Sequence, residues 1–408
     1  MWDGLDSALG VSVKPAARAP APTQSNQDTA VPAPPRKREP FNLFGGVSFF
    51  GGLDGALGVS AAKPQVEGAA GRPRPTPTPL RSTFTPGRVV RDAKDGATRS
   101  NDANADDDAP PLVVFVHGLE SHGGTWDDLV ARFASASAPA PSFLAVDLRG
   151  HGRTPVGNEA SFTPAALAAD VAACVEAHAG ASAGRKVVLV GHSMGARVAA
   201  RVCADFPGLG VRHLVVEDMD ARVFDGAAHF GRTFGEKGFD YDRARAFETN
   251  AASLEAMTAS LVGAAGPFTF AKERVDGYVA RGRVFETSAG RAISLIHPLG
   301  FCLAFDRVLA SDDTQEALTK IASMPAHARP SVHLWRAPED CGESCAAEAP
   351  GVAGGVAWIK ARFPVGAVHD CVFPDAGHSV HNTRADLFER ALRALVFQGT
   401  PATLEEER

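Results

Sequence analysis

The chain has 408 residues, of which 45% are hydrophobic and 22% charged, so it is long enough to bury a large core. Its formal net charge is −6, but residues 1–100 carry 13 lysines and arginines against 8 acidic residues, which leaves the remainder acidic. An acidic folded part argues against nucleic-acid binding, and no apolar run approaches the roughly 18 residues of a membrane-spanning helix. We therefore expect a soluble intracellular protein, either cytoplasmic or in an organelle if the N-terminal region is a transit segment.

Residues 1–86 hold 13 of the 29 prolines and many small residues. Such a composition cannot bury enough apolar surface to offset the entropy of ordering, so a disordered tail is predicted. Within it, residues 4–12 return with one substitution as residues 52–60. Two copies of a short amphipathic motif on a tether suit docking to a protein partner, and a duplication without function is the alternative.

From Pro111 onward, apolar runs alternate with helical patterns. Strands are predicted at Leu112–Val116, Phe143–Val146, Val187–Val190, Leu214–Val216, Val332–Trp335 and Ala367–Phe373, with an early one at Arg88–Asp92. This alternation predicts an α/β fold with a mostly parallel sheet covered on both faces. Residues 221–329 interrupt it with helical stretches and no convincing strand. The folded part is therefore divided into a first core segment (87–220), a helical cap (221–329) and a second core segment (330–398).

The pentapeptide Gly191-His192-Ser193-Met194-Gly195 lies between an apolar strand and a helix of small residues. A G-x-S-x-G motif in this context places its serine on a sharp, strained turn with the hydroxyl exposed. Glycine is needed on both sides because a Cβ there would collide with the neighbouring strand or helix. Ser193 is the predicted nucleophile, and an inert serine in a glycine-rich turn is the alternative.

Three further motifs accompany this turn: His117-Gly118-Leu119-Glu120 after a strand, the D-L-R-G-H-G-R-T segment 147–154, and Ala376-Gly377-His378. In order and context they resemble the α/β-hydrolase superfamily over residues 86–398, with Thr154 in place of the usual serine. The turn together with the run L-V-V-E-D-M-D at 214–220 is most similar to small acyl-ester hydrolases, which include bacterial esterases and mitochondrial α/β-hydrolase-domain proteins. The resemblance implies a doubly wound sheet with an inserted cap.

A serine hydroxyl is a weak nucleophile until a base takes its proton, and the base needs an acid to orient it. His378, between the last strand and the last helix, is the predicted base, and His381 is the fallback. Two aspartates qualify as the acid. Asp340 stands where most superfamily members carry it, and Asp218 stands one strand earlier, where the resembled subgroup does. We favour Asp340, keep Asp218 as the alternative and treat Glu339 as a minor third.

The resemblance also implies an oxyanion hole made by the backbone N–H groups of Leu119 and Met194. The cap would shape an apolar acyl pocket, and its candidate lining residues, which could equally form the cap's own core, are Phe230, Phe234, Phe268, Phe270, Phe285 and Ile296. No metal-ligand spacing, Walker loop or dinucleotide fingerprint is present, so no metal and no cofactor are expected.

These features predict a serine hydrolase that cleaves a small-molecule carboxylic ester or thioester through an acyl-enzyme intermediate. Epoxide hydrolases and haloalkane dehalogenases of the same fold use aspartate as the nucleophile, so Ser193 argues against both. One alternative is acyl transfer, C–C hydrolysis or lyase chemistry with the same residues. A second is a hydrolase-like interaction protein without catalysis, docked through its N-terminal repeat.

Overall fold

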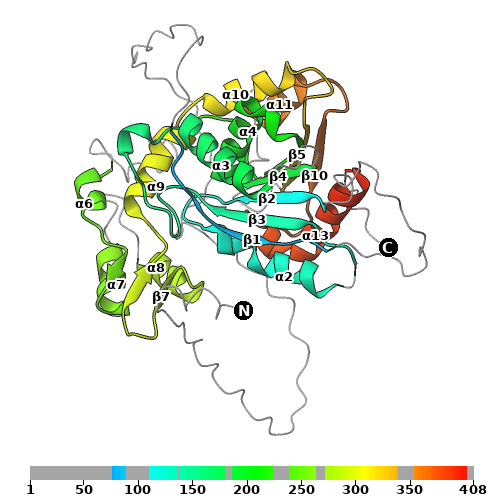
Figure 1. The fold of residues 1–408 in the computed structure, drawn as a ribbon. Helices are drawn as coiled ribbons and strands as arrows, with labels where there is room; N and C mark the ends of the chain where they lie inside the picture. The colour runs from blue at the N-terminus through cyan, green and yellow to red at the C-terminus, as the bar shows by residue number, and fades with distance from the viewer. Residues whose placement is uncertain are drawn as a thin grey trace, which may run out of the picture.

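The central feature of the molecule is one seven-stranded sheet. The computed structural model describes residues 76–88, 110–136, 138–179, 186–224, 239–262, 272–338 and 353–401. The strand order is β1 (Arg81–Thr85), β3 (Ser142–Asp147), β2 (Leu112–Val116), β4 (Val187–His192), β5 (Val211–Glu217), β9 (Ser331–Arg336) and β10 (Val368–Val372) (Figure 1). β1 runs antiparallel to β3, and the other pairs are parallel. The sheet is the mostly parallel one that the sequence predicts.

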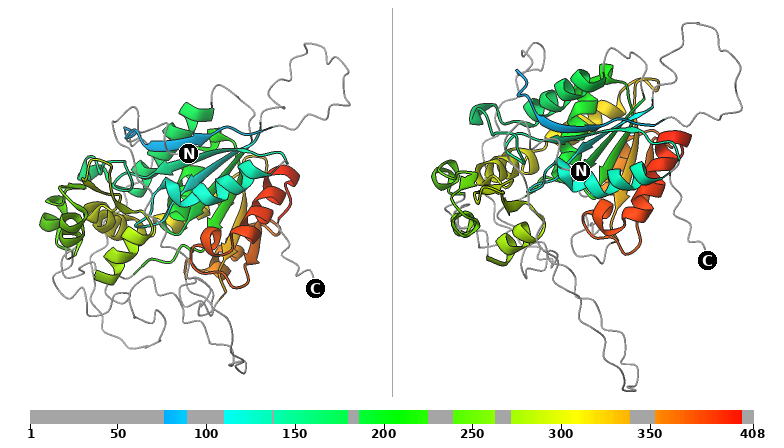
Figure 2. Two further views of the ribbon diagram at one scale, coloured as in Figure 1. Left: turned by 90° about the horizontal axis from the view of Figure 1, so that it is seen from below. Right: turned by 60° about the horizontal axis from the view of Figure 1, so that its bottom comes forward.

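Helices cover both faces of this sheet (Figure 2). One face carries α3 (Pro164–Ala179), α4 (Met194–Asp205), α10 (Asp313–Ala322) and α11 (Val356–Arg362), and the other carries α2 (Asp127–Ser135), α12 (Val380–Thr383) and α13 (Ala385–Arg393). Because side chains alternate along a strand, β2 sends Val114 and Val116 into one core and Val113 and Phe115 into the other. Burial on both faces explains why the central strands are continuous apolar runs.

Shorter helical segments connect these elements. They are η1 (Gly123–Trp126), η2 (Glu159–Ser161), η3 (Pro207–Leu209) and the π-helical η6 (Phe305–Leu309) and η8 (Ala394–Gln398). None of the helices in the described ranges is long and apolar enough to cross a bilayer.

The folded part begins earlier than the sequence analysis places it. β1 lies within residues 1–86, all of which were assigned to a disordered tail. A strand was also expected at Arg88–Asp92. Its first residue, Arg88, forms an isolated bridge with Ala140, and residues 89–92 lie outside the described ranges. β1 is held by its pairing with β3 and by Thr154 Oγ1, which accepts from the Arg81 amide at 2.9 Å. Such distant partners leave no periodic signal in the strand's own sequence. Residues 1–75, with the repeat, are also outside the described part.

An insertion between β5 and β9 forms a separate unit beside the sheet (Figure 1). It contains α6 (Tyr241–Arg245), β6 (Asn250–Ala251), α7 (Leu254–Leu261), α8 (Lys272–Ala280), β7 (Val284–Glu286), β8 (Ala292–Ser294) and α9 (Pro298–Ala304), which together we call the cap. β6, β8 and β7 form a small antiparallel sheet, so the helical cap also contains three short strands that the sequence analysis does not predict. Strands of two or three residues are too short to show a period of two in the sequence.

The predicted cap also extends too far. α10 packs against α4, and its Leu318 and Ile321 are buried in the core on that face of the main sheet. Among the candidate pocket-lining residues, Ile296 is buried in the cap's own core and Phe285 is half-buried on β7. Phe230, Phe234, Phe268 and Phe270 lie outside the described residues.

A buried ion pair braces the loop after β3. Arg149 Nε and Nη2 donate to the two carboxylate oxygens of Asp170 on α3, at 2.6 and 2.7 Å. The two side chains are 1% and 0% exposed. Asp147, two residues before this arginine, accepts from the amide of Gly123 at 2.6 Å. Through Asp147 and Arg149, the D-L-R-G-H-G segment therefore links the loop after β3 to Gly123 and to α3 near the carboxyl edge of the sheet.

Replacing Arg149 by methionine should lower the free energy of unfolding by about 3–5 kcal/mol, because it leaves the Asp170 carboxylate buried and unpaired. The double variant Arg149→Met/Asp170→Leu should recover much of this loss, since neither buried charge remains. Denaturant unfolding measures both. The matched control is Arg245→Met, which breaks an exposed pair with Glu159 and should change stability little. Equal losses in Arg149→Met and in the control would contradict this role for Arg149.

Candidate active site

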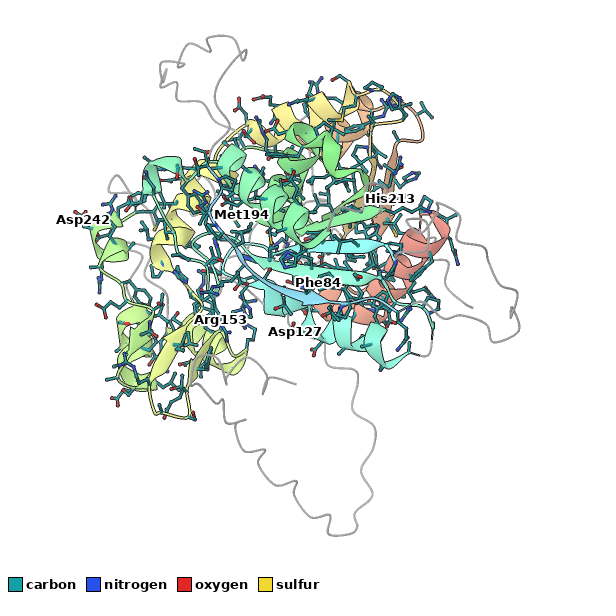
Figure 3. The ribbon with its side chains drawn as sticks, viewed as in Figure 1. Phe84, Asp127, Arg153, Met194, His213 and Asp242 are labelled. Atoms are coloured by element: carbon teal, nitrogen blue, oxygen red, sulfur yellow. The ribbon has the colours of Figure 1, made fainter. Side chains whose placement is uncertain are left out.

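Ser193 lies on the tight turn between β4 and α4, whose first residue, Met194, is labelled in Figure 3. Its backbone has φ 52° and ψ −124°, a conformation that residues with a Cβ rarely adopt. A Cβ on Gly191 would lie 2.4 Å from Ala196 Cα, and one on Gly195 would lie 2.2 Å from the Val116 carbonyl oxygen. Glycine is thus required on both sides, and the strand–turn–helix geometry of a nucleophile elbow is present.

The segment His117-Gly118-Leu119 lies directly against this turn. A Cβ on Gly118 would come within 2.9 Å of Ser193 Cβ. His117 holds the segment in place: its Nε2 accepts from the Leu148 amide at 3.0 Å, so Nδ1 carries the proton and donates to the Gly118 carbonyl at 2.8 Å. Burial lowers the pKa of His117 to about 3, so the ring stays neutral. The backbone on both sides of Leu119 is therefore fixed beside Ser193.

His378 follows β10 and approaches the same turn from the other side. Its carbonyl oxygen accepts from His192 Nε2 at 3.0 Å, and the two imidazole rings lie 4.9 Å apart. His192 is buried, and burial lowers its pKa well below the ordinary value, so the donor is a neutral imidazole. His192 immediately precedes Ser193, and the contact links the backbone at His378 to the elbow.

Asp218 orients the ring of His378. His378 Nδ1 lies 2.7 Å from Asp218 Oδ2, and Asp218 Oδ1 accepts from the Ala337 amide at 3.0 Å. The Asp218 amide in turn donates to the Trp335 carbonyl at 2.8 Å. The Asp218 side chain is fully buried, while that of His378 is 19% exposed. Asp340, the acid favoured from the sequence, lies outside the described residues, as does Glu339.

A second histidine–carboxylate pair lies next to the first. Glu217 Oε1 accepts from the backbone amide and from Nδ1 of His381, at 2.9 and 2.7 Å. Both side chains are at most 1% exposed, and the ring of His381 lies against Trp126, with centroids 3.8 Å apart. His381, the fallback base, is thus enclosed. The sequence analysis missed the pairing of Glu217, although its position beside Asp218 at the end of β5 was a signal.

The charge state of this pair follows from its surroundings. Glu217 Oε2 is buried without a hydrogen-bond partner, and burial raises the pKa of Glu217 to about 7. Burial also lowers the pKa of His381 to about 3, so this imidazole is neutral and its Nδ1–H donates to Glu217. Near neutral pH, Glu217 is therefore partly protonated, in contrast to an ordinary surface glutamate.

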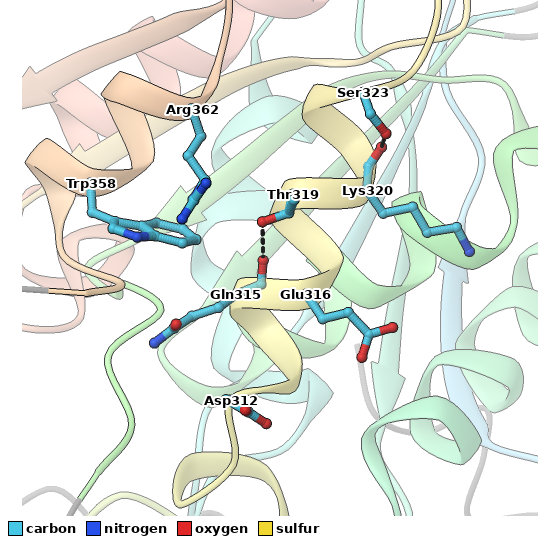
Figure 4. Close-up of a pocket in the computed structure, with 8 residues that line it drawn as sticks. All are labelled: Asp312, Gln315, Glu316, Thr319, Lys320, Ser323, Trp358 and Arg362. Carbon is cyan, nitrogen blue, oxygen red and sulfur yellow. Dashed lines mark hydrogen bonds between the residues drawn. The ribbon is translucent and has the colours of Figure 1, made fainter. Parts of the chain in front are cut away.

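Other polar clusters lie away from this site. A shallow hollow of about 570 Å³ between α10 and α11 is lined mainly by polar and charged side chains (Figure 4). His213, His333 and His369 line neighbouring strands, with His213 Nδ1 3.2 Å from His333 Nε2. In the part of the chain that the structure describes, no group of three or more His, Cys, Asp or Glu side chains is arranged to hold a metal ion.

Comparisons with known proteins identify the family of this chain. The sequence model described as "Alpha/beta hydrolase family" matches residues 113–391, well over half of the chain. The protein therefore belongs to the α/β-hydrolase family.

Its curated relatives match over short segments. A protein of Haemophilus influenzae named as an esterase/lipase is 35% identical over 119 residues, which cover 29% of this chain and 38% of that protein. The 2-(acetamidomethylene)succinate hydrolase of Mesorhizobium japonicum is 33% identical over 26% of this chain and 35% of its own length. Mouse protein phosphatase methylesterase 1 is 35% identical over 23% of this chain and 24% of its own.

Among solved structures, a marine microorganism esterase superposes with a TM-score of 0.50. The match covers 76% of this chain and 97% of the esterase, at 14% sequence identity. A likeness at this level of identity concerns the fold alone.

The raised pKa of Glu217 makes stability depend on pH in a defined direction. The unfolded carboxyl ionises near 4.5 and the folded one near 7, so the folded state keeps its proton longer, and stability falls as the pH rises between these values. The loss should approach about 3 kcal/mol. In Glu217→Gln this contribution is absent, so the difference in unfolding free energy between wild type and variant should shift by that amount between pH 5 and 8. Denaturant unfolding at several pH values measures it, and a constant difference would contradict the raised pKa.

Proposed function

We propose that the protein is a serine hydrolase that cleaves a carboxylic ester or thioester, with Ser193 as nucleophile, His378 as base and Asp218 as acid. The observation that carries the proposal is the contact of His378 Nδ1 with Asp218 Oδ2 beside the strained turn of Ser193. Asp218 replaces Asp340 as the preferred acid because this contact sets the ring of His378. The names of the relatives, an esterase/lipase and a methylesterase among them, support ester chemistry.

The mechanism follows from which nitrogen of His378 carries the proton. When Nδ1–H donates to the Asp218 carboxylate, Nε2 is the unprotonated nitrogen and can take the proton of the Ser193 hydroxyl. The serine oxygen attacks the carbonyl carbon, and the oxyanion accepts hydrogen bonds from the amides of Leu119 and Met194. The imidazolium then protonates the leaving alcohol or thiol. Water, activated by His378, hydrolyses the acyl-enzyme and releases the acid.

Covalent labelling tests the nucleophile. Wild-type protein should react with a fluorophosphonate probe and hydrolyse p-nitrophenyl esters, and Ser193→Ala should lose labelling, with kcat falling about 10⁴-fold or more. Intact-mass spectrometry and steady-state kinetics measure the two effects. Analysis of the products from p-nitrophenyl ester and acyl-CoA panels separates hydrolysis from acyl transfer. Equal labelling of wild type and variant, or none of either, would overturn the proposal.

Two matched substitutions test the choice of acid. Asp218→Asn should lower kcat by about 10⁴-fold, because an asparagine cannot hold the imidazole in the required tautomer or stabilise the imidazolium. Asp340→Asn should leave kcat near the wild-type value. Both variants keep the size of the side chain, and circular dichroism checks that they fold. The reverse pattern would assign the acid to Asp340.

A further inference from the structure

Glu120, the residue after the proposed oxyanion donor Leu119, is a buried carboxylate held by the cap. Its Oε1 accepts from the Tyr278 hydroxyl and its Oε2 accepts from Arg274 Nη2, each at 2.6 Å. Arg274 Nε also donates to the Tyr278 hydroxyl at 2.9 Å, which closes a three-membered cluster. Glu120 and Arg274 side chains are 6% and 9% exposed. Tyr278 and Arg274 both come from α8, so one helix of the cap binds both carboxylate oxygens.

A third contact reaches the backbone of the same residue. Arg283 Nη1 donates to the Glu120 carbonyl oxygen at 2.6 Å. Arg283 is itself anchored within the cap, because its amide donates to the Tyr278 carbonyl and its carbonyl accepts from the Leu295 amide, each at 2.8 Å. The cap therefore holds Glu120 by its side chain and by its main chain, from two successive segments of the insertion.

These contacts are needed because Glu120 is in an unfavourable conformation. Its φ is 57°, a left-handed value that glycine adopts readily and glutamate does not. A carboxylate buried to this extent also requires charged or hydrogen-bonding partners. The cap supplies these partners and holds the strained backbone of Glu120. The position of the docked cap therefore fixes the backbone of the loop that carries Leu119.

We propose that Glu120 is a positioning residue through which the docked cap aligns the oxyanion donor at Leu119. This inference rests on the proposed function. The oxyanion forms during the reaction and is absent from the bound ester. A displaced donor therefore reduces the stabilisation of the transition state more than it reduces the affinity for substrate. Loss of the Glu120 contacts should therefore lower kcat and leave KM nearly unchanged.

The test uses the full-length protein with p-nitrophenyl butyrate as substrate. Glu120→Gln and Tyr278→Phe should each lower kcat about 10-fold or more, a fraction of the 10²–10³-fold that a whole oxyanion donor contributes, with KM within about two-fold of wild type. The double variant should lose little more than the worse single variant, because both substitutions break one shared contact. Tyr278→Phe removes a single hydroxyl and keeps the buried ring, so it tests the inference even if Glu120→Gln fails to fold.

The matched control is Lys272→Met on the same helix. Lys272 pairs with Asp276 on the exposed side of α8 at 2.6 Å and should be replaceable with kcat unchanged. Unchanged kcat in both Glu120→Gln and Tyr278→Phe, a rise in KM alone, or an equal loss of kcat in the control would overturn the inference. Those results would leave the labelling of Ser193 intact, so they differ from a failure of the proposed function, in which wild-type protein itself is neither labelled nor active.

Discussion

The site depends on a strained turn at Ser193 that is enforced by packing from two sides. The positive φ of this residue persists because Gly195 lies against the carbonyl groups at the end of β2, and Gly191 lies against the start of α4. The Ser193 amide also donates to the Glu217 carbonyl at 2.9 Å, which ties the turn to the end of β5. Since β2, β4 and β5 are parallel neighbours, their carboxyl ends meet at one edge, and the polar side chains that follow them converge there.

Two adjacent acids at the end of β5 each contact a histidine, and the two histidines differ in their exposure to solvent. Glu217, the last residue of β5, and Asp218, which follows it with a positive φ of 43°, contact different histidines. Each meets a histidine of the segment after β10, but the His378 side chain is 19% exposed and that of His381 is 1% exposed. His381 Nε2 lies 3.2 Å from Thr125 Oγ1, so both nitrogens of this buried imidazole have partners and the ring cannot reach a substrate. The first pair is therefore suited to proton transfer and the second to holding the segment in place.

The cap holds the loop that follows β2 beside Ser193. A catalytic loop that needs a non-glycine residue at positive φ must draw its stability from elsewhere in the fold. Here Arg274, Tyr278 and Arg283 supply it from more than 150 residues further along the chain. The docked insertion therefore fixes the backbone at Glu120 in a conformation that the loop would not hold by itself.

Local patterns in the sequence were enough to predict a mostly parallel α/β sheet and the strand–turn–helix at Ser193, and the motifs carried the resemblance to the α/β-hydrolase superfamily. Each depends on neighbours within a few residues, such as an apolar run, a glycine pair or a turn before a helix. Tertiary structure alone decided that Asp218 contacts His378, because the two residues are 160 positions apart in the chain. It also decided the pairing of β1, the short strands of the cap and the partners of Glu120. Those features depend on contacts between distant segments, and such contacts leave no period or spacing in the sequence itself.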